Sequence, residues 1–505
     1  MSKRLLIGCD IGTSGTKTVA TDAQGKIYAH ATKNYGIITL HNQWAEQWPE
    51  VWLDAAVETI AEVVSKIPSE EIAGICISAL YGGTGVLCDS EMNPLRPAII
   101  WLDRRAEEES RWVAENIGED KIFEVSKNGI DSYFGYIKLL WVQRHEPELW
   151  EKVKMILPVH SYIVYKLTGK LTVDYCSAGN VGGIYDYTDH CWSKQMAQAM
   201  RIDYDALPHD FYAPDEVAGT INEQYTQRMG LPNGTPLCVG TVDCIASMLS
   251  AAMAKEGDNA AILGTSLNWG FVHSKTPNNP NLISMPYCTE PEKMSYVYGG
   301  ASTAGALPRW FMTNFMQDES PEAYARLEQE IVDEKIPAGS NGLMVLPYFM
   351  GERTPIWDEN ATGLILGLSL SHTKAHIFKA ILESAAYSLL HIMESMTGGE
   401  QVEKIILIGG GSKSDVWKTV FADVTGIPVY TPVKSVEAPL GDAFMAGIGT
   451  GLIKSYDEIS SWVSFNQPVL PNMENHKKYL EYFSVYKGLY PRLKSDMKQL
   501  KGLSF

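Results

Sequence analysis

Apolar and polar positions alternate in short runs near the start of the chain, and this pattern predicts β-strands. "RLLIGCD" is mostly apolar, "TKTVATD" and "KIYAHAT" alternate, and glycine-containing turns separate the three runs. In "WPEVWLDAAVETIAEVVSKI" the apolar residues recur every three or four positions, which predicts a helix with Pro49 in its first turn. The run "IAGICIS" then predicts a buried strand. A meander followed by a helix and a strand indicates an α/β domain.

The second half of the chain repeats this order of elements. "NAAILGTS" and "LNWGFVHS" predict two strands joined by a turn, after a strand "PLCVGTVDC" that leads into the helix "IASMLSAAMA". Further on we expect the helix "AHIFKAILESAAYSLLHIME", the strand "KIILIGGG", the helix "DVWKTVFADVTG" and the Gly/Ala-rich helix "LGDAFMAGIGTG". The patterns of residues 110–235 define no topology. We therefore expect two domains, 1–250 and 251–505, divided just before the second meander.

The composition is typical of a globular protein whose partner is a small molecule. The 505 residues are 45% hydrophobic and 20% charged, and 42 basic against 60 acidic residues give a net charge of −18. That charge argues against nucleic-acid and anionic-membrane partners, which need clustered lysine and arginine. Eight scattered cysteines without a CxxC pair predict a reduced, cytoplasmic protein. No apolar run is long enough for a membrane span.

The same turn occurs once in each half, as Gly12-Thr13-Ser14 and as Gly264-Thr265-Ser266. A glycine turn at the end of a strand exposes consecutive N–H groups that a phosphate can approach closely. A single turn of this kind is most often only a hairpin. Two turns at matching places predict a duplicated domain whose turns grip one polyphosphate from both sides.

Two aspartates follow strands at the kind of place where α/β folds bind ligands. Asp10 ends the first strand, and it is either a water-mediated Mg²⁺ partner or an acceptor for the N–H groups of its own turn. Asp243 follows "PLCVGTV", and it is either a helix N-cap or a base that accepts a hydroxyl proton during transfer to phosphate. Lys17 on the second strand contacts either phosphate or only solvent.

Three consecutive glycines in "IILIGGGSKSDVWK" stand between a strand and a helix whose N-cap is Ser414 or Asp415. An ordinary strand-to-helix turn does not need three glycines, so close approach of a ligand is favoured. The spacing matches neither GxGxxG nor GxxxxGK[ST], which excludes the dinucleotide-fold and P-loop interpretations.

Together these features resemble the FGGY carbohydrate kinases, a family within the actin-like, sugar-kinase and heat-shock ATPase superfamily. "GLILGLSLSHTKAHIFKAILES" is similar to the C-terminal signature of the family, and "YFMGERTPIWDENATG" is similar to its GERxPxWDxxARG segment, with Thr362 in place of arginine. "SYFGYIKLLW" keeps part of the other signature, with Gly135 where Pro, Ser or Thr is usual. The resemblance covers essentially the whole chain. It implies an α/β fold of two ribonuclease-H-like domains around a central cleft, which close over ATP.

The resemblance also implies roles for individual residues. Asp243 matches the catalytic aspartate, although Cys244 follows it where the family usually has an amide. Asp10 is the implied Mg²⁺ residue, acting through water. The implied ATP-binding residues are Asp10, Gly12, Thr13, Ser14, Lys17, Gly264, Thr265, Ser266, Gly305, Gly410, Gly411 and Asp415. The implied substrate-binding residues are Tyr81, Trp101, Asp103, Arg104, Asp243 and Asn268.

The implied activity is in-line phosphoryl transfer from ATP to a hydroxyl of a pentulose, a related ketose or a polyol, with Asp243 as base. The chain is similar to the xylulokinase branch, but "SALYGGTGV" lacks the Gln-Met-His-Gly of that branch, which argues against xylulose. A gluconate or other sugar-acid kinase is the alternative, which Arg104 and Arg105 keep open. An actin- or chaperone-like conformational ATPase is the alternative from another class, and the GERxPxW-like segment and the family signature speak against it. The resemblance implies a homodimer, because relatives often form one.

Overall fold

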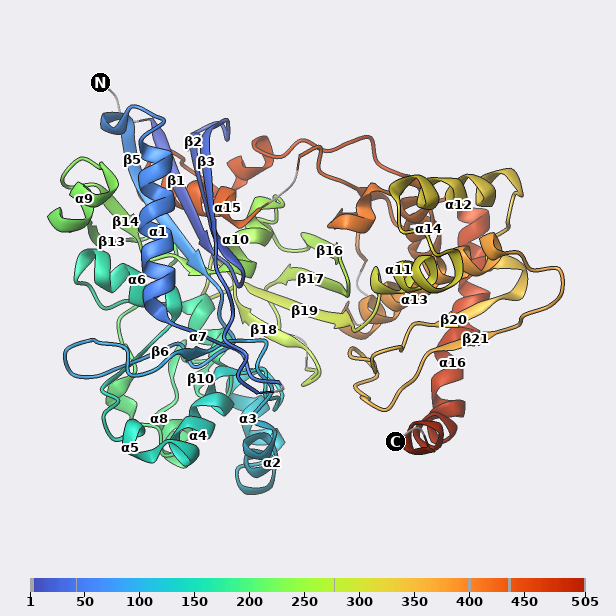
Figure 1. Ribbon diagram of the computed structural model, residues 1–505, viewed down its shortest axis with the longest axis horizontal. Helices are drawn as coiled ribbons and strands as arrows, with labels where there is room; N and C mark the ends of the chain where they lie inside the picture. The colour runs from blue at the N-terminus through green and yellow to red at the C-terminus, as the bar shows by residue number, and fades with distance from the viewer. Residues whose placement is uncertain (1–3, 42, 277, 398–400, 435–436, 504–505) are drawn as a thin grey trace. The chain divides into compact units, whose positions relative to one another are not determined.

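The chain divides into two units in the computed structural model, which describes residues 4–41, 43–276, 278–397, 401–434 and 437–503. Unit 1 consists of Met1–Asp258, Val272–Val297 and Val436–Ser464. Unit 2 consists of Asn259–Phe271, Tyr298–Ser435 and Phe465–Phe505. Each unit combines a β-sheet with helices packed on it, as the α/β pattern of the sequence predicts (Figure 1). A single division near residue 250 stays a prediction.

Unit 1 is built on a sheet with the strand order β13-β14-β5-β1-β2-β3, in which β15 also pairs with β5. β1, β2 and β3 form an antiparallel meander, and β5 lies parallel to β1 on its other side. These strands are β1 (Leu5–Ile11), β2 (Gly15–Asp22), β3 (Ile27–Asn34), β5 (Ile72–Ala79), β13 (Val217–Thr220), β14 (Pro236–Cys238) and β15 (Thr241–Val242). The meander and the following buried strand are thus confirmed.

Helices cover both faces of this sheet because successive side chains of β1 point to opposite sides. On one face α1 (Pro49–Val64) packs against β1, β2 and β3, and its Trp52 lies in one core with Ile7 of β1. On the other face α15 (Ala438–Gly449) packs against β1 and β5 (Figure 1). Gly8 permits this contact, since a Cβ there would lie 1.9 Å from the carbonyl oxygen of Pro439.

The rest of unit 1 consists of short helices and small two-stranded sheets, which pair β4 with β7, β6 with β8, β9 with β12 and β10 with β11. Their strands are β4 (Glu46–Gln47), β6 (Val86–Cys88), β7 (Ala98–Ile99), β8 (Met155–Leu157), β9 (Val173–Asp174), β10 (Tyr185–Asp186), β11 (Cys191–Trp192) and β12 (Phe211–Tyr212). β18 (Ile283–Pro286) belongs to none of these small sheets and pairs with β19 (Ser295–Ala301). The helices are α2 (Glu107–Asn116), α3 (Glu119–Ser126), α4 (Gly135–His145), α5 (Pro147–Trp150), α6 (Val159–Thr168), α7 (Tyr175–Val181), α8 (Lys194–Ala199), α9 (Glu223–Met229) and α10 (Asp243–Ser250).

Unit 2 repeats the hairpin of unit 1. β16 (Asn259–Leu263) and β17 (Leu267–His273) are antiparallel, and β22 (Ile405–Ile408) lies parallel to β16, as β5 lies parallel to β1. β23 (Val429–Tyr430) extends the sheet beyond β22. The strand–turn–strand pattern that the sequence predicts twice is therefore present twice.

α13 (Lys374–Thr397) is buried along most of its length and packs against α12, α14 and β20 of unit 2. The remaining elements are β19 (Ser295–Ala301), which crosses the division between the units, β20 (Met344–Leu346), β21 (Leu364–Leu366), α11 (Ala306–Phe311), α12 (Pro321–Asp333), α14 (Asp415–Thr425) and α16 (Met473–Leu503). The helix, strand and helix expected after residue 370 are confirmed as α13, β22 and α14. The Gly/Ala-rich helix is confirmed as α15 and belongs to unit 1. No helix in the described ranges is both long and apolar enough to cross a membrane.

Candidate active site

The carboxyl ends of three parallel strands in unit 1 meet beside Asp10. Asp10 of β1 lies opposite Ser78 of β5, and Ser78 lies opposite Thr241 of β15. Asp243 follows β15 directly as the first residue of α10, whose N-cap is Val242. Asp10 and Asp243 therefore reach the same edge of the sheet, which is where α/β folds bind their ligands.

In the first Gly-Thr-Ser turn the carbonyl groups accept hydrogen bonds from other residues, whereas two of the amide groups donate none to the described residues. Tyr35 Oη donates to the Gly12 carbonyl at 2.7 Å, Gln47 Nε2 donates to the Thr13 carbonyl at 2.9 Å, and the Tyr35 amide donates to the Ser14 carbonyl at 3.1 Å. The N–H groups of Thr13 and Ser14 donate to no described residue. The turn thus presents backbone donors, which is what binding of phosphate oxygens requires.

Lys17 lies opposite Asp10 in the pairing of β1 with β2, so it reaches the same edge. Its Nζ forms an ion pair with Glu437 at 2.9 Å, and about half of both side chains is exposed. An exposed pair of this kind contributes little stability. A phosphate can therefore compete for Lys17, whose role in ATP binding stays a prediction.

Asp10 and Asp243, both half-buried, share their surroundings with a third carboxylate, the fully buried Asp442 of α15. Burial raises the pKa of Asp10 well above its usual range, the charge of Asp243 raises this pKa further, and Lys17 opposes the shift. Burial raises the pKa of Asp243 to about 6. Burial and the charge of Asp10 also raise the pKa of Asp442, although Ser78 Oγ donates to its Oδ2 at 2.8 Å. Desolvation thus raises the pKa of all three carboxyl groups at this edge of the sheet.

Sequence reasoning missed Asp442, which it assigned only to a helix. The signal was a single acidic residue within the otherwise apolar and glycine-rich run "LGDAFMAG". A buried carboxylate in such a helix is costly unless it is paired or neutralised. Asp442 has such a pairing on only one oxygen, since Ser78 Oγ donates to its Oδ2 and its Oδ1 has no partner among the described residues.

Asp10 fits a magnesium ion that is held through water. Its Oδ1 is buried and has no hydrogen-bond partner among the described residues. In the same part of the chain, no group of three or more His, Cys, Asp and Glu side chains could hold a metal ion. Because Mg²⁺ keeps several of its waters and takes few protein ligands, one carboxylate with a free oxygen suits the predicted role.

The second Gly-Thr-Ser turn, in unit 2, is arranged like the first. The Gly305 amide donates to the Gly264 carbonyl at 2.9 Å, and the Ala306 amide donates to the Thr265 carbonyl at 3.1 Å. The N–H groups of Thr265 and Ser266 donate to no residue in the described ranges. Gly305 is required by packing, since a Cβ there would lie 2.3 Å from the Gly264 carbonyl oxygen. This turn also presents amide donors.

A pocket of about 950 Å³ opens beside the second turn, within unit 2. Five of the residues expected to bind ATP line it: Gly264, Thr265, Gly305, Gly410 and Gly411. Much of the wall is apolar and comes from Pro308, Trp310, Pro321, Tyr324, Phe378 and Leu382. An apolar pocket next to a turn with free amides suits a nucleotide, whose base is buried while its phosphates meet the amides.

The three glycines after β22 serve different purposes. Gly409 has a φ of 96°, and a Cβ there would lie 2.5 Å from the Leu263 carbonyl oxygen. A Cβ on Gly411 would lie 2.4 Å from Leu263 Cδ2 and 2.8 Å from Trp417 Cζ3. A Cβ on Gly410 would meet nothing within 4 Å. Two of the glycines are thus required by packing, and Gly410 leaves open space for a ligand.

Of the unit 2 residues expected to bind ATP or sugar, three are not part of the pocket wall: Ser266, Asn268 and Asp415. Ser414 is the N-cap of α14, and the side chain of Asp415, which follows it, is 93% exposed. Asn268 Oδ1 accepts a hydrogen bond of 3.2 Å from Arg353 Nη2. The binding roles of these three residues stay predictions.

All the residues expected to bind the sugar except Asn268 lie in unit 1, among them Tyr81 and Trp101. Trp101 Nε1 donates to Thr13 Oγ1 at 2.9 Å, and 37% of Trp101 is exposed. Tyr81 is buried, and the next residue, Gly82, has a φ of 77°. A Cβ on Gly82 would lie 3.0 Å from both Trp101 Cβ and Tyr133 Cζ. The segment with Trp101 thus adjoins the first phosphate turn.

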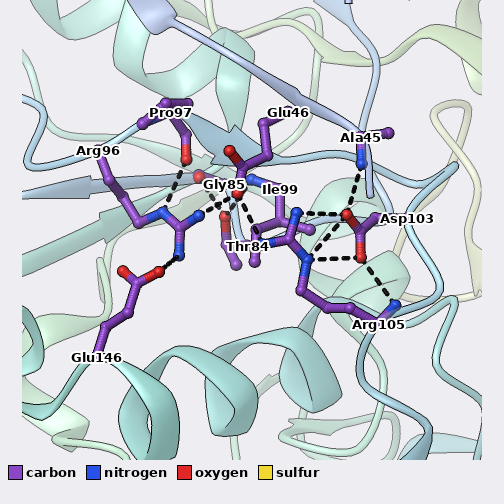
Figure 2. A network of polar contacts seen from close by, with 10 residues as sticks. All are labelled: Ala45, Glu46, Thr84, Gly85, Arg96, Pro97, Ile99, Asp103, Arg105 and Glu146. Atoms are coloured by element: carbon purple, nitrogen blue, oxygen red, sulfur yellow. Dashed lines mark hydrogen bonds and ion pairs between the residues drawn. The ribbon is translucent and has the colours of Figure 1, made fainter. Parts of the chain in front are cut away.

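Asp103 is buried, and its partners are Arg105 of the same segment and the amide of Ala45, as Figure 2 shows. Its carboxylate accepts hydrogen bonds from Arg105 Nε at 2.9 Å, Arg105 Nη2 at 2.6 Å and the Ala45 amide at 2.6 Å. Arg105 Nη1 also pairs with Glu46 at 2.8 Å, and its guanidinium lies 3.6 Å from the centre of the Trp44 ring. These contacts anchor the segment, and a direct contact of Asp103 with sugar stays a prediction.

The network extends to Arg96, whose guanidinium contacts Glu46 and, at 2.8 Å, Glu146 (Figure 2). Arg104 points elsewhere and pairs with Asp131 at 2.5 Å, with 42% of the arginine side chain exposed. Arg104 and Arg105, the two arginines on which the sugar-acid alternative depends, therefore both pair with carboxylates of the protein.

Lys138 is a fully buried cation that sequence reasoning did not single out. Its Nζ donates to the carbonyl groups of Gly82 at 2.7 Å and Tyr133 at 2.6 Å. Burial, together with the charge of Arg104, lowers the pKa of Lys138 to about 7. Lys138 ties the loop after β5 to the start of α4. The available signal was a lysine within the apolar helix "GYIKLLW".

A second buried network holds the strand that leads to Asp243. Thr241 Oγ1 donates to Asp174 Oδ2 at 2.8 Å, and Asp174 Oδ1 lies 2.9 Å from His160 Nε2. Burial raises the pKa of Asp174, but the interactions with His160 and Ser177 outweigh it, so the pKa is lowered overall. Asp174 is therefore ionised and fixes Thr241, two residues before Asp243.

Two family models match the chain and together cover most of it. The model for the N-terminal domain of the FGGY family of carbohydrate kinases matches residues 5–250. The model for the C-terminal domain of the same family matches residues 259–450.

Individual proteins match along nearly their whole length. A xylulose kinase of Bacillus subtilis (strain 168) is 30% identical over 505 residues, which is 99% of each chain. The crystal structure of ligand-bound xylulose kinase from Lactobacillus acidophilus aligns with a TM-score of 0.91 at 25% identity, over 98% of this chain and 99% of that one. A gluconate kinase from the same organism aligns with a TM-score of 0.90 at 25% identity and the same coverage.

Proposed function

The chain belongs to the FGGY family of carbohydrate kinases, and we propose that it transfers the terminal phosphoryl group of ATP to a hydroxyl of a pentulose, a related ketose or a polyol. The kinase class and ATP as the donor follow from the family. The alternative of a purely conformational ATPase therefore falls away. The observation that carries the residue-level proposal is the common sheet edge of Asp10, Asp243 and the first phosphate turn.

In the proposed reaction Asp243 accepts the proton of the attacking hydroxyl as the sugar oxygen bonds to the γ-phosphorus. The bond from that phosphorus to the bridging oxygen breaks, and ADP leaves. A pKa of about 6 keeps Asp243 mostly ionised at neutral pH and makes it a stronger base than an exposed aspartate. The amides of the two Gly-Thr-Ser turns are proposed to stabilise the charge on the phosphates.

Asp10 is the residue proposed to hold Mg²⁺, through water. The buried Oδ1 of its carboxylate, which no described residue contacts by a hydrogen bond, supports this role. When bound, Mg²⁺ supplies positive charge that neutralises the phosphate oxygens. An ionised Asp10 is favoured by that charge, which offsets the desolvation that raises its pKa.

An uncharged acceptor is favoured over a sugar acid because nearby arginines are already paired. Arg105 is buried between Asp103 and Glu46, and Arg104 pairs with Asp131. To use either arginine, the carboxylate of a sugar acid must displace a protein carboxylate, and breaking the buried pair is strongly unfavourable. A sugar-acid kinase is the second candidate, which the similarity to a gluconate kinase supports.

A coupled assay of ADP release tests the proposal over a panel of pentuloses (xylulose included), other ketoses, polyols and aldonic acids. We expect ADP release to depend on an uncharged sugar or polyol. Faster turnover with an aldonic acid would favour the second candidate. ADP release that no member of the panel changes would contradict the proposed function.

We further propose that the enzyme is cytoplasmic, acts on small molecules and forms a homodimer. All eight cysteines are free, which suits a reducing compartment. Light scattering of the purified protein tests the assembly, and a monomer mass would contradict it.

A further inference from the structure

Asn180, near the end of α7, is a buried amide with little hydrogen bonding. Only 1% of the residue is exposed. Its Nδ2 donates to Tyr133 Oη over 3.4 Å, and its Oδ1 has no partner within the described ranges. A side-chain amide offers two N–H donors and an oxygen with two lone pairs, so most of this capacity is unused. Because unsatisfied buried polar atoms are costly and rare, this one calls for a partner.

The hydrogen-bond partner of Asn180 lies on the proposed sugar side of unit 1. The ring of Tyr133 packs against Gly82, where a Cβ would lie 3.0 Å from both Tyr133 Cζ and Trp101 Cβ. Lys138 Nζ binds the carbonyl groups of Gly82 and Tyr133 and so holds the two segments together. Asn180, Tyr133 and Trp101 therefore form one row of neighbouring side chains.

α7 also links Asn180 to the proposed base. Asp174 is the N-cap of α7 and accepts the hydrogen bond from Thr241, two residues before Asp243. At 1.5 Å per residue, the helix separates Asp174 from Asn180 by about 9 Å along its axis. One end of α7 thus lies by the base and the other by the row with Trp101. This spacing suits an acceptor that reaches Asp243 with one hydroxyl and Asn180 with another.

A purely structural role fits the contacts of Asn180 poorly, as a second buried asparagine shows. Asn128 Nδ2 donates to the carbonyl groups of Ser126 at 2.8 Å and Ser284 at 2.9 Å, and its Oδ1 accepts from the Ser284 amide at 2.8 Å. Asn128 therefore joins two segments with three short hydrogen bonds. Asn180 makes one long hydrogen bond, which holds little together.

We propose that Asn180 binds a hydroxyl of the acceptor sugar, remote from the one that is phosphorylated, and so determines which sugars are accepted. The inference rests on the proposed function, because it assumes a polyhydroxylated acceptor beside Trp101. A hydroxyl can donate a hydrogen bond to Oδ1 and accept one from Nδ2, so it can pair with both the unused acceptor and an unused donor of Asn180. A sugar that lacks this hydroxyl leaves the amide of Asn180 unsatisfied, so the site is expected to bind that sugar more weakly.

The test combines variants of Asn180 with matched sugars. Asn180→Leu keeps the approximate size of the side chain and removes its hydrogen bonding, and Asn180→Ala removes both. Each variant is assayed with the best acceptor of the panel and with analogues that lack one remote hydroxyl at a time. We expect the KM of the acceptor to rise about tenfold in both variants, while the KM of ATP stays unchanged. The analogue that lacks the hydroxyl proposed to contact Asn180 should have the same KM with wild type and with both variants, because that hydrogen bond is absent in every case.

Asn128→Ala is the matched control, since it removes an equally buried amide. It loses three hydrogen bonds, so we expect a lower Tm and an unchanged preference for the acceptor over its deoxy analogues. Asn180→Leu removes one long hydrogen bond and is expected to keep the wild-type Tm. Calorimetric titration with the acceptor in the absence of ATP provides a readout independent of turnover, and the Asn180 variants should bind about tenfold more weakly.

Two results would overturn the inference alone while wild type remains a sugar-dependent kinase. One is the same discrimination between the acceptor and every deoxy analogue in wild type and in the Asn180 variants. The other is a lower Tm together with equal rises in the KM of acceptor and ATP, which would make Asn180 a structural residue. If wild type releases ADP with no member of the panel, the proposed function fails, and the inference fails with it.

Discussion

Burial raises the pKa of three carboxyl groups in unit 1, Asp10, Asp243 and Asp442, and the charges of neighbouring carboxylates raise the pKa of Asp10 and Asp442 further. Lys17 supplies a positive charge that lowers the pKa of Asp10, but its own side chain is half exposed and paired with Glu437. Carboxylates in such surroundings hold protons more strongly than exposed ones. This acidic cluster is where the proposed chemistry is most sensitive to single substitutions and to pH.

Asp243→Asn keeps the size of the side chain and removes its ability to accept a proton. We expect kcat with the best acceptor to fall by at least about 100-fold, because general-base catalysis supplies roughly that factor or more. Binding of ATP, measured by calorimetric titration, should be unchanged. Asp205→Asn, at an exposed aspartate of the same unit, is the control and should keep full activity. Retention of more than a few per cent of kcat by Asp243→Asn would refute its role as base.

The pKa of Asp243 also sets the expected pH profile. Burial raises this pKa to about 6, and the protonated form cannot accept the hydroxyl proton. We therefore expect kcat/KM to be level above about pH 7 and to fall nearly tenfold per pH unit well below pH 6. The midpoint belongs to the cluster as a whole, because the carboxylates interact. A profile that stays level down to pH 5, measured with saturating ATP, would contradict this assignment.

Asp442→Asn tests the cost of burying the third carboxylate. Because burial raises the pKa of Asp442, folding favours its neutral form. That contribution to stability is complete below the unfolded pKa of about 3.9 and is lost as pH rises through the higher folded pKa. Asparagine is neutral throughout, so we expect the variant to have a higher Tm than wild type at pH 8 and a smaller advantage at pH 5. Each kcal/mol of difference corresponds to about 2–4 °C. An equal or lower Tm of the variant at pH 8 would contradict the prediction.

Among the elements, the sequence patterns identified those that depend on local contacts. Alternation in "TKTVATD" predicted β2, and the three-to-four period of "AHIFKAILESAAYSLLHIME" predicted α13. The region 110–235 gave no topology because its helices have four to eleven residues and its strands two to four. Such short elements complete too few periods to show a pattern, and contacts between distant segments decide their places.

In the candidate site, too, features formed by consecutive residues could be predicted from the sequence, whereas contacts between distant residues could not. The glycine turns are contiguous in the sequence, so their free amides could be anticipated from composition and spacing. The partnership of Ser78 with Asp442 joins residues 364 positions apart, and Arg105 meets Glu46 from another part of the chain. A single sequence gives no signal for such pairs, which is why Asp103 appeared as a sugar contact rather than as a partner of Arg105.

Gly305→Ala tests whether the second Gly-Thr-Ser turn binds the nucleotide. Its Cβ would lie 2.3 Å from the Gly264 carbonyl oxygen, so the turn must shift. We expect a lower Tm and a KM of ATP raised by about tenfold or more, with the KM of the sugar much less affected. Gly410→Ala is the control for strain, because its Cβ would meet nothing within 4 Å, and it should keep the wild-type Tm. An unchanged KM of ATP in Gly305→Ala would contradict a role of this turn in nucleotide binding.

Over the whole molecule, the two units are not consecutive stretches of chain. Unit 1 takes Val436–Ser464 from near the C-terminal end, and this segment carries α15. A reading of the sequence in order places α15 with its neighbours in the second half. Local sequence patterns do not reveal the contact of α15 with Gly8, because the glycine that permits the close approach is far from Pro439 in the sequence.

A fragment of residues 1–258 should therefore not fold by itself. Without α15, the face of β1 that carries Leu6 and Gly8 loses the helix that covers it. We expect the fragment to be insoluble or to unfold without a cooperative transition, whereas the full chain unfolds cooperatively. Circular dichroism during thermal unfolding measures this. A soluble fragment with a sharp transition would show that α15 is dispensable for the sheet.

The late position of α15 has a consequence for biosynthesis. β1 leaves the ribosome long before its covering helix, which is complete only at Gly449. At translation rates of 5–20 residues per second, the interval is roughly 20–90 s. During that time the nascent sheet offers an unprotected apolar surface to chaperones and to other nascent chains. Slower elongation lengthens this exposure, so we expect it to lower the yield of soluble protein.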